Sequence, residues 1–238
     1  MSERLPLALV IGVGGATGRS VCQRFAAEYR LVMLARSESV IGPLAAALPH
    51  ASAYQCDVSA RDDYGRILTT IVVEHGLPDV IVVNTEGGGW GAYHEIDLDR
   101  FAASFPVNVV ALLALVQTLF PDPAAITKTC RVVISSSEAA YHSDPYYLGL
   151  APSRAGQRVV AESLDQVLAP HGVEFCVLSI AGAIDEPKMR AAFKSETDEF
   201  FIKPDAIADF VYVLTRNELP ARAKITNQGT QQESRGSD

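Results

Sequence analysis

A cluster of glycines directly follows the first apolar run of the chain. Residues 7–11 read Leu-Ala-Leu-Val-Ile, which is typical of a strand buried on both faces of a parallel sheet. The spacing of Val21 and Phe25 predicts a helix over residues 16–29. A glycine-rich turn at such a junction lets the backbone approach a pyrophosphate, and the helix N-terminus supplies free N–H groups and a positive dipole end. The sequence therefore predicts a dinucleotide site formed by Gly12, Gly14, Gly15, Ala16, Thr17 and Gly18.

The rest of the chain alternates between strand-like and helix-like segments. We expect strands over residues 7–11, 31–35, 53–55, 80–83, 131–134 and 174–180, and helices over residues 16–29, 40–48, 64–75, 101–120, 153–168 and 206–214. This alternation predicts βαβ units and an α/β fold of the Rossmann type, a doubly wound parallel sheet in three layers (αβα). We expect Asp205 to be the N-cap of the last helix.

The domain organisation follows from length and composition. The chain has 238 residues, of which 48% are hydrophobic and 20% charged, and it shows no linker or repeat. We therefore expect residues 1–228 to form a single globular domain. Residues 229–238 are polar and are expected to be a flexible tail.

Charge and cysteine usage restrict the partners and the compartment. A net charge of −8 argues against nucleic acid or an anionic membrane as a partner. The apolar run over residues 107–120 is shorter than a membrane span, and the N-terminus lacks the pattern of a signal peptide. The cysteines show no metal spacing, which predicts four buried thiols and no metal. We expect a cytoplasmic protein that acts on a small molecule.

Two predicted helices are apolar on more than one face. The helix over residues 101–120 has almost no polar side, and the helix over residues 153–168 is similar. A helix that is apolar all round must be covered on both sides. The sheet covers one side, and we expect a second copy of the chain to cover the other in a homodimer or homotetramer.

The residues after the second predicted strand bear on the identity of the nucleotide. An acidic residue there would accept hydrogen bonds from the ribose 2′-hydroxyl of NAD. This chain has Arg36 and Ser37 instead, with no carboxylate before Glu38. A guanidinium can pair with a 2′-phosphate, and a serine hydroxyl can add a hydrogen bond. The sequence thus favours NADP over NAD, with a solvated surface arginine as the alternative.

These segments together resemble the short-chain dehydrogenase/reductase family, from Leu7 to about Thr226. The turn resembles the family's Gly-x-x-x-Gly-x-Gly, with Ala16 at the middle glycine. Residues 185–203 match the family's mobile substrate lid, in which Glu186 replaces a threonine that binds the carboxamide. The resemblance also implies cofactor contacts from residues after the third, fourth and sixth predicted strands, namely Asp57, Val58, Asn84, Thr85, Glu86, Gly182 and Ile184.

The family's catalytic residues are only partly matched. Asn108 matches the asparagine of the catalytic tetrad. The serine is Ser136 if the strand ends are matched, and Ser137 if residues are counted back from the tyrosine position. That tyrosine position holds Leu150, and the lysine position holds Arg154. The chain therefore resembles a divergent subgroup that lacks the active-site tyrosine.

These substitutions change the chemistry that the site can perform. Leucine has no proton to donate, and an arginine stays protonated and cannot relay a proton. We expect Arg154 to bind the nicotinamide ribose, with an outward-facing helix arginine as the alternative. Tyr147, seven residues before Arg154, is a candidate replacement donor, with surface packing as its alternative.

The nucleotide turn and the altered catalytic positions together predict two alternative functions. The first is an NADP(H)-dependent oxidoreductase that acts on a carbonyl or alcohol with an altered active site. The second is a non-redox NADP(H)-binding protein on the same fold. That protein would be a pseudoenzyme, a sensor or an isomerase-like enzyme with Glu86 as its base, although Glu86 can also simply face solvent.

Overall fold

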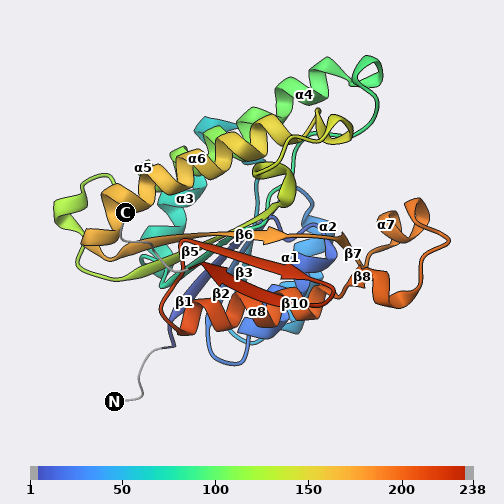
Figure 1. Ribbon diagram of the computed structural model, residues 1–238. Helices are drawn as coiled ribbons and strands as arrows, with labels where there is room; N and C mark the ends of the chain where they lie inside the picture. The colour runs from blue at the N-terminus through green and yellow to red at the C-terminus, as the bar shows by residue number, and fades with distance from the viewer. Residues whose placement is uncertain (1–4, 234–238) are drawn as a thin grey trace.

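The computed structural model describes residues 5–233 and places a large sheet between two layers of helices (Figure 1). The sheet has the strand order β10-β9-β6-β5-β4-β1-β2-β3, and every neighbouring pair is parallel except β9 with β10. The predicted Rossmann-type fold is confirmed. The strands are β1 (Leu7–Ile11), β2 (Arg30–Ala35), β3 (Ala51–Gln55), β4 (Val80–Val83), β5 (Cys130–Ser137), β6 (Val173–Ile180), β9 (Arg222–Thr226) and β10 (Gly229–Glu233).

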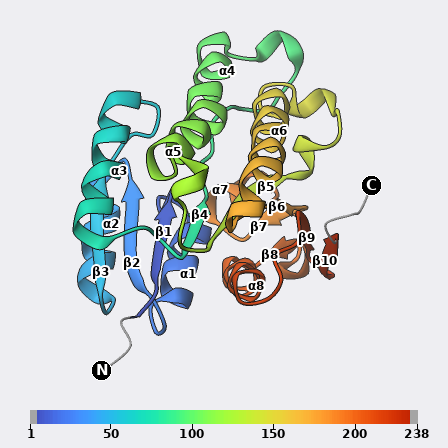
Figure 2. The ribbon, with the colours of Figure 1, turned by 90° about the vertical axis from the view of Figure 1, so that its left-hand side faces the viewer.

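Helices cover both faces of this sheet (Figure 2). One layer contains α1 (Ala16–Phe25), α2 (Glu38–Ala47) and α8 (Pro204–Arg216), and the other contains α3 (Arg61–His75), α5 (Ala111–Leu119) and α6 (Ala151–Leu168). Side chains of a strand alternate between faces, so Val10 packs toward the first layer and Leu9 toward the second. All of β1 is therefore buried, which explains its continuous apolar sequence.

One long helix differs from the sequence prediction. The segments α4 (Leu98–Phe105), η2 (Pro106–Val110) and α5 form a continuous helix of 22 residues, in which η2 is a π-helical turn. Pro106 has no backbone N–H, so it cannot continue the regular α-helical ladder. By length and hydropathy alone this helix could cross a membrane, which the shorter expected run could not. Its inner side belongs to the core of the fold, which accounts for much of its apolar character.

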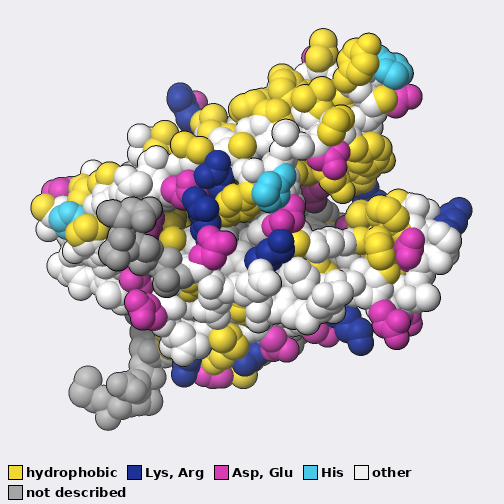
Figure 3. Space-filling view, in the orientation of Figure 1, with side chains coloured by type: hydrophobic (Ala, Val, Ile, Leu, Met, Phe, Trp, Pro, Cys, Tyr) yellow, Lys and Arg dark blue, Asp and Glu magenta, His cyan; other side chains and the backbone are white. Residues whose placement is uncertain are grey.

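The outer sides of α4, α5 and α6 carry exposed apolar residues. Figure 3 shows apolar side chains gathered over the helices at the top of the molecule. Val110 and Leu113 are 46% and 40% exposed, and Val159 of α6 is 51% exposed. The expected second apolar face is therefore present on these helices, and its cover by another copy of the chain stays a prediction.

The C-terminal part of the chain corrects two expectations. Residues 229–233 are not an irregular tail, because they form β10 antiparallel to β9, while residues 234–238 lie outside the described part. Asp205 is not the N-cap of α8. The helix begins at Pro204, whose fixed φ suits the first position, so Lys203 is the N-cap and Asp205 lies in the first turn.

The predicted lid, residues 185–203, has regular structure of its own. It contains α7 (Pro187–Ala192) and ends after β8 (Phe201–Ile202), which pairs with β7 (Ala183–Ile184) in a small parallel ladder. Figure 1 shows this segment projecting from one end of the sheet. The short 3₁₀ turns are η1 (Tyr93–Glu95), η3 (Pro123–Ala125), η4 (Glu138–Ala140), η5 (Pro145–Tyr147), η6 (Ala169–His171) and η7 (Asp198–Phe200).

Candidate nucleotide site and active site

The turn between β1 and α1 requires glycine at two positions. Gly12 has φ +93°, and a Cβ on it would lie 2.4 Å from the carbonyl oxygen of Asn84. A Cβ on Gly18 would lie 2.6 Å from the carbonyl oxygen of Gly12 and 2.8 Å from the Cα of Val13. At Gly14 a Cβ would meet nothing within 4 Å. Gly12 and Gly18 thus close the turn, and Gly14 leaves it open to solvent.

The N-terminus of α1 is suited to an anion. Gly15 is the N-cap, with extended backbone, and within residues 5–233 no side chain makes a capping hydrogen bond to it. The first turn of α1 contains no acidic residue. Thr17 and Gly18 are buried, whereas Gly14 and Gly15 are exposed. The first N–H groups of a helix need an acceptor, so this turn presents donors and a positive dipole end to a bound anion.

The ends of β2 and β3 form the second part of the predicted nucleotide site. Arg36 and Ser37 are exposed, and the guanidinium of Arg36 makes no hydrogen bond or ion pair with the described residues. The hydrogen bond from the Ser59 hydroxyl holds the pKa of Asp57 below its usual range, and the nearby charge of Arg36 acts in the same direction. Val58 is buried beside them. The Arg36 guanidinium therefore lies where a 2′-phosphate is expected, with no hydrogen bond or ion pair to another described residue.

The end of β4 is tied to the glycine turn. The Asn84 side chain donates from Nδ2 to the carbonyl oxygen of Gly12 at 3.1 Å. Thr85 is buried and its hydroxyl lies 3.5 Å from the carbonyl oxygen of Val107. Glu86 is exposed. The structure thus brings Asn84 to the turn and leaves the carboxylate of Glu86 in solvent.

The two predicted lid contacts lie at the entrance to the lid. Ile184 belongs to β7 and pairs in register with Ile202 of β8. A Cβ on Gly182 would lie 3.0 Å from the side chain of Ile202, so a larger residue would press on β8. Both positions therefore shape the start of the lid.

Asn108 is completely buried in the π-helical turn η2. Its Nδ2 donates to the carbonyl oxygen of Gly87 at 3.0 Å and to the Ser153 hydroxyl at 2.9 Å. Its Oδ1 accepts from the backbone N–H of Gly87 at 3.2 Å. These contacts make Asn108 a positioning residue that fixes the loop after β4 against α6.

Arg154 is buried, which excludes an outward-facing arginine. Its Nη1 donates to the carbonyl oxygen of Ser135 at 3.1 Å and to Oε1 of Gln157 at 2.9 Å. Burial lowers the pKa of Arg154, and the charge of Glu86 opposes this effect. The Nε of Arg154 has no hydrogen-bond partner among the described residues. A buried cation with an unused donor is costly unless an acceptor reaches it.

The serines extend β5 beyond its predicted end. The hydroxyl oxygens of Ser135, Ser136 and Ser137 are shielded from solvent, and none has a hydrogen-bond partner within residues 5–233. Ile134 packs in the core on the α6 side, so strand alternation places Ser136 on that side and Ser137 on the other. Three unsatisfied hydroxyls, distributed over both faces, mark this strand end as a polar site, and Arg154 binds its backbone at Ser135.

A packed leucine, Leu150, occupies the position where the family has its tyrosine. Leu150 is buried at the start of α6, where a Cβ on Gly88 would lie 3.1 Å from its Cα. Tyr147 lies in η5 and is 38% exposed, and its ring packs against that of Tyr146 with 5.7 Å between centroids. Within the described chain, no hydrogen bond joins Tyr147 to the serines or to Arg154. The structure therefore does not bring this candidate donor into contact with the rest of the site.

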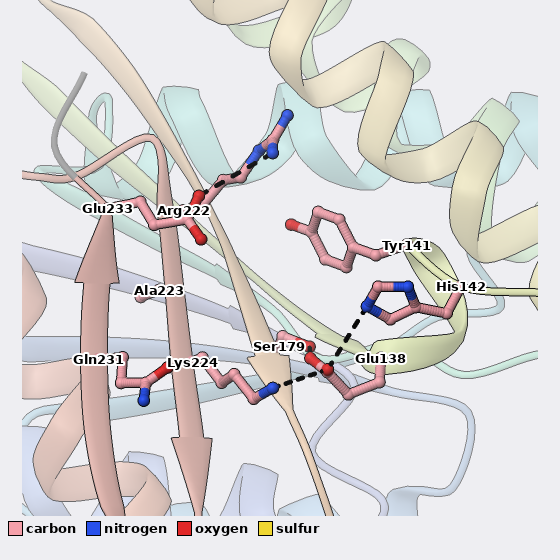
Figure 4. Close-up of a pocket in the computed structure, with 9 residues that line it drawn as sticks. All are labelled: Glu138, Tyr141, His142, Ser179, Arg222, Ala223, Lys224, Gln231 and Glu233. Carbon is pink, nitrogen blue, oxygen red and sulfur yellow. Dashed lines mark hydrogen bonds and ion pairs between the residues drawn. The ribbon is translucent and has the colours of Figure 1, made fainter. Parts of the chain in front are cut away.

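A polar cavity of about 290 Å³, which the sequence does not predict, lies next to the end of β5 and is lined by residues that include Glu138, Ser179 and Lys224 (Figure 4). Glu138 lines this cavity, follows Ser137 directly, and accepts hydrogen bonds from the Ser179 hydroxyl at 2.5 Å and from Nζ of Lys224 at 2.8 Å. Burial opposes ionisation, but these hydrogen bonds outweigh it and hold the pKa of Glu138 below its usual range. His142 also points toward this carboxylate. Glu138 thereby anchors the end of β5 to β6 and β9.

Known proteins match this chain over most of its length. The sequence model of a family described as short chain dehydrogenase matches residues 6–198. A protein of Streptomyces violaceoruber, named as ketoacyl reductase 2 of granaticin polyketide synthase, is 33% identical over 181 residues, which cover 71% of each chain.

Solved structures share the fold. An alcohol dehydrogenase from the archaeon Thermococcus sibiricus, complexed with 5-hydroxy-NADP, superimposes with a TM-score of 0.83 at 18% identity, covering 97% of this chain and 100% of the other. A variant of actinorhodin polyketide ketoreductase with NADPH superimposes with a TM-score of 0.79 at 20% identity, covering 93% and 95%.

Proposed function

Because the chain belongs to the short-chain dehydrogenase/reductase family, we propose that it is an NADP(H)-dependent oxidoreductase that acts on a small carbonyl or alcohol substrate with an altered active site. The observation that carries this proposal is the turn closed by Gly12 and Gly18 in front of the uncapped N-terminus of α1. Those donors fit a pyrophosphate. The nucleotides present in the two similar structures support the same assignment.

The preference for NADP over NAD rests on the end of β2. Arg36 is exposed and its guanidinium makes no hydrogen bond or ion pair within residues 5–233, while the neighbouring Ser37 hydroxyl lies 2.7 Å from the Ser39 hydroxyl. A 2′-phosphate would pair with this cation, whereas the unphosphorylated ribose of NAD would find no carboxylate after β2 before Glu38.

Different residues of the chain have different roles at the reacting carbonyl. Bound NADPH supplies the hydride. Ser136 or Ser137 donates a hydrogen bond to the substrate oxygen from a hydroxyl that has no other described partner. Arg154 contributes a fixed positive charge and an unused Nε donor, and its Nη1 binds the carbonyl oxygen of Ser135. A proton must still reach the oxygen, and Tyr147 would have to swing inward from η5 to supply it.

A second function is favoured by one specific observation. Leu150 fills the tyrosine position and is buried against Gly88, so no proton donor stands there. A protein with this packing would bind NADP(H) without transferring a hydride, as a pseudoenzyme or a sensor, or would use Glu86 as an isomerase base.

Nucleotide titration tests the binding part of the proposal. We expect wild-type protein to bind NADPH more tightly than NADH, and Arg36→Gln to weaken NADPH binding by about 10- to 100-fold while leaving NADH unchanged, since a hydrogen-bonded charge pair contributes roughly 1.5–3 kcal/mol. Arg61→Gln is the matched control, because Arg61 is exposed and meets only its neighbour Asp62 at 3.7 Å. If Arg36→Gln lowered the affinity for NADPH and NADH equally, Arg36 would not recognise the 2′-phosphate.

Turnover separates the two functions. NADPH oxidation with a panel of carbonyl compounds should fall on Ser136→Ala, Ser137→Ala or Tyr147→Phe replacement if the protein is a reductase. The double variant Leu150→Tyr with Arg154→Lys restores the family's donor pair. Activity that appears only in this variant would support the non-redox function.

We also propose that the protein is cytoplasmic and that a second copy covers the exposed apolar side of α5 and α6. The exposed side chains of Val110, Leu113 and Val159 support this assembly.

A further inference from the structure

The carboxylate of Glu186 lies at the glycine-rich turn. Its Oε2 is 3.8 Å from the position that a Cβ on Gly15 would take, and Gly15 is the N-cap of α1. Carboxylates are stabilised at helix N-termini, where N–H groups and the dipole attract negative charge. A side chain from the lid therefore shares the region that the proposed function assigns to a pyrophosphate.

The lid holds Glu186 in this place. Arg190 forms a two-pronged ion pair with Asp185, with N–O distances of 2.6 and 2.8 Å, and a third contact with Asp198 at 2.5 Å. The backbone N–H of Glu186 donates to the carbonyl oxygen of Ile184 at 2.8 Å, and its own carbonyl oxygen accepts from the N–H of Arg190. The backbone on both sides of Glu186 is thus fixed by the lid's own contacts.

The described lid contains four cations, Lys188, Arg190, Lys194 and Lys203, and none of them forms an ion pair with Glu186. Arg190 is engaged by its two aspartates, and Nζ of Lys188 lies 4.3 Å from the ring centroid of Trp90. Among the described residues no ion pair is formed by the Glu186 carboxylate. The Glu186 carboxylate therefore lies near the N-cap Gly15 without an ion-pair partner among the described residues.

We propose that Glu186 sets the nucleotide affinity of this site, by competing with the pyrophosphate of NADP(H) for the N-terminus of α1. This inference rests on the proposed function. The pyrophosphate and the carboxylate are both anions, and like charges a few ångströms apart in a partly buried site repel strongly. The Glu186 side chain must therefore turn away from Gly15 when the nucleotide binds.

Calorimetric titration of the full chain with NADPH tests this inference. Glu186→Gln keeps the size of the side chain and removes its charge, and Glu186→Thr also removes its bulk. We expect both variants to bind NADPH about tenfold more tightly than wild type or better, since a tenfold change corresponds to a small part of one close charge repulsion. Glu196→Gln, at an exposed glutamate of the lid, is the matched control and should bind like wild type.

A second probe localises the effect. 2′-AMP carries the phosphate expected at Arg36 but has no pyrophosphate, so its affinity should not change in Glu186→Gln. Equal strengthening of 2′-AMP and NADPH would overturn the inference, because the effect would then not arise at the pyrophosphate. Equal or weaker NADPH binding by Glu186→Gln would overturn it and leave the proposed function intact. If neither the wild type nor the Glu186 variants bind NADPH, the proposed function itself fails.

Discussion

Replacing Gly18 by alanine should destabilise the protein, although alanine is the better helix former. The added Cβ would lie 2.6 Å from the carbonyl oxygen of Gly12 and 2.8 Å from the Cα of Val13, and neither backbone atom can rotate away. Overpacking costs roughly 1–3 kcal/mol, and two backbone overlaps place this site near the upper end. The higher helix propensity of alanine offsets about 1 kcal/mol of this cost. The net loss is about 2 kcal/mol, or roughly 4–8 °C in Tm for a chain of this size.

Thermal and urea unfolding measure this loss, with Gly14→Ala as the matched control. A Cβ on Gly14 meets nothing within 4 Å, so its unfolding free energy should stay within about 0.5 kcal/mol of wild type. NADPH titration gives a second measurement, because a displaced turn no longer directs its N–H groups at one point. If Gly18→Ala and Gly14→Ala were equally stable, the close approach of Gly18 to the turn would not exist in solution.

Three other predictions concern titration, reactivity and assembly. Glu138 has a lowered pKa, so its pairing with Lys224 stabilises the fold above the ordinary glutamate pKa and is lost as pH falls through the folded-state value. The Tm difference between wild type and Glu138→Gln should therefore shrink on acidification, and a constant difference would contradict this. Burial raises the pKa of Cys22 to about 12, so a thiol reagent at neutral pH should modify it only in urea, and rapid reaction of the native protein would be a contrary result. Val110→Glu and Leu113→Glu should reduce the mass in light scattering to that of a monomer with little change in Tm, and a monomeric wild type would refute the assembly.

The core of the fold could be predicted because its signals are local. The apolar run of β1 and the periodicity of α1 are contained in a few consecutive residues. The sequence of β10, Gly-Thr-Gln-Gln-Glu, has no apolar residue, and its five residues are all exposed, so only its pairing with β9 reveals it. In β9, Ala223 and Ile225 are buried and the residues beside them are not. An alternation that contains only two apolar residues is too short to predict a strand.

From the residues alone, the geometry of the candidate site could be predicted only for the glycine turn, and distant residues such as Asn84 and Arg154 were expected through the family resemblance. Gly12 and Gly18 belong to one turn, so their spacing already defines their geometry. The burial of Arg154 depends on β5 and on the path of α6, and the position of Glu186 beside Gly15 depends on the lid. Contacts between segments so far apart in the chain leave no pattern in either segment.

The hydrogen bonds of Asn108 give the molecule a mechanical connection. The helix that carries Val110 on its outer surface is joined by the Asn108 amide to both backbone groups of Gly87, and Thr85 adds a contact to the Val107 carbonyl. If the helix tilts, either the loop moves with it or these hydrogen bonds break. Breaking them is costly because they are buried and water cannot replace them. The helix and the loop after β4 are therefore expected to move as one unit rather than independently.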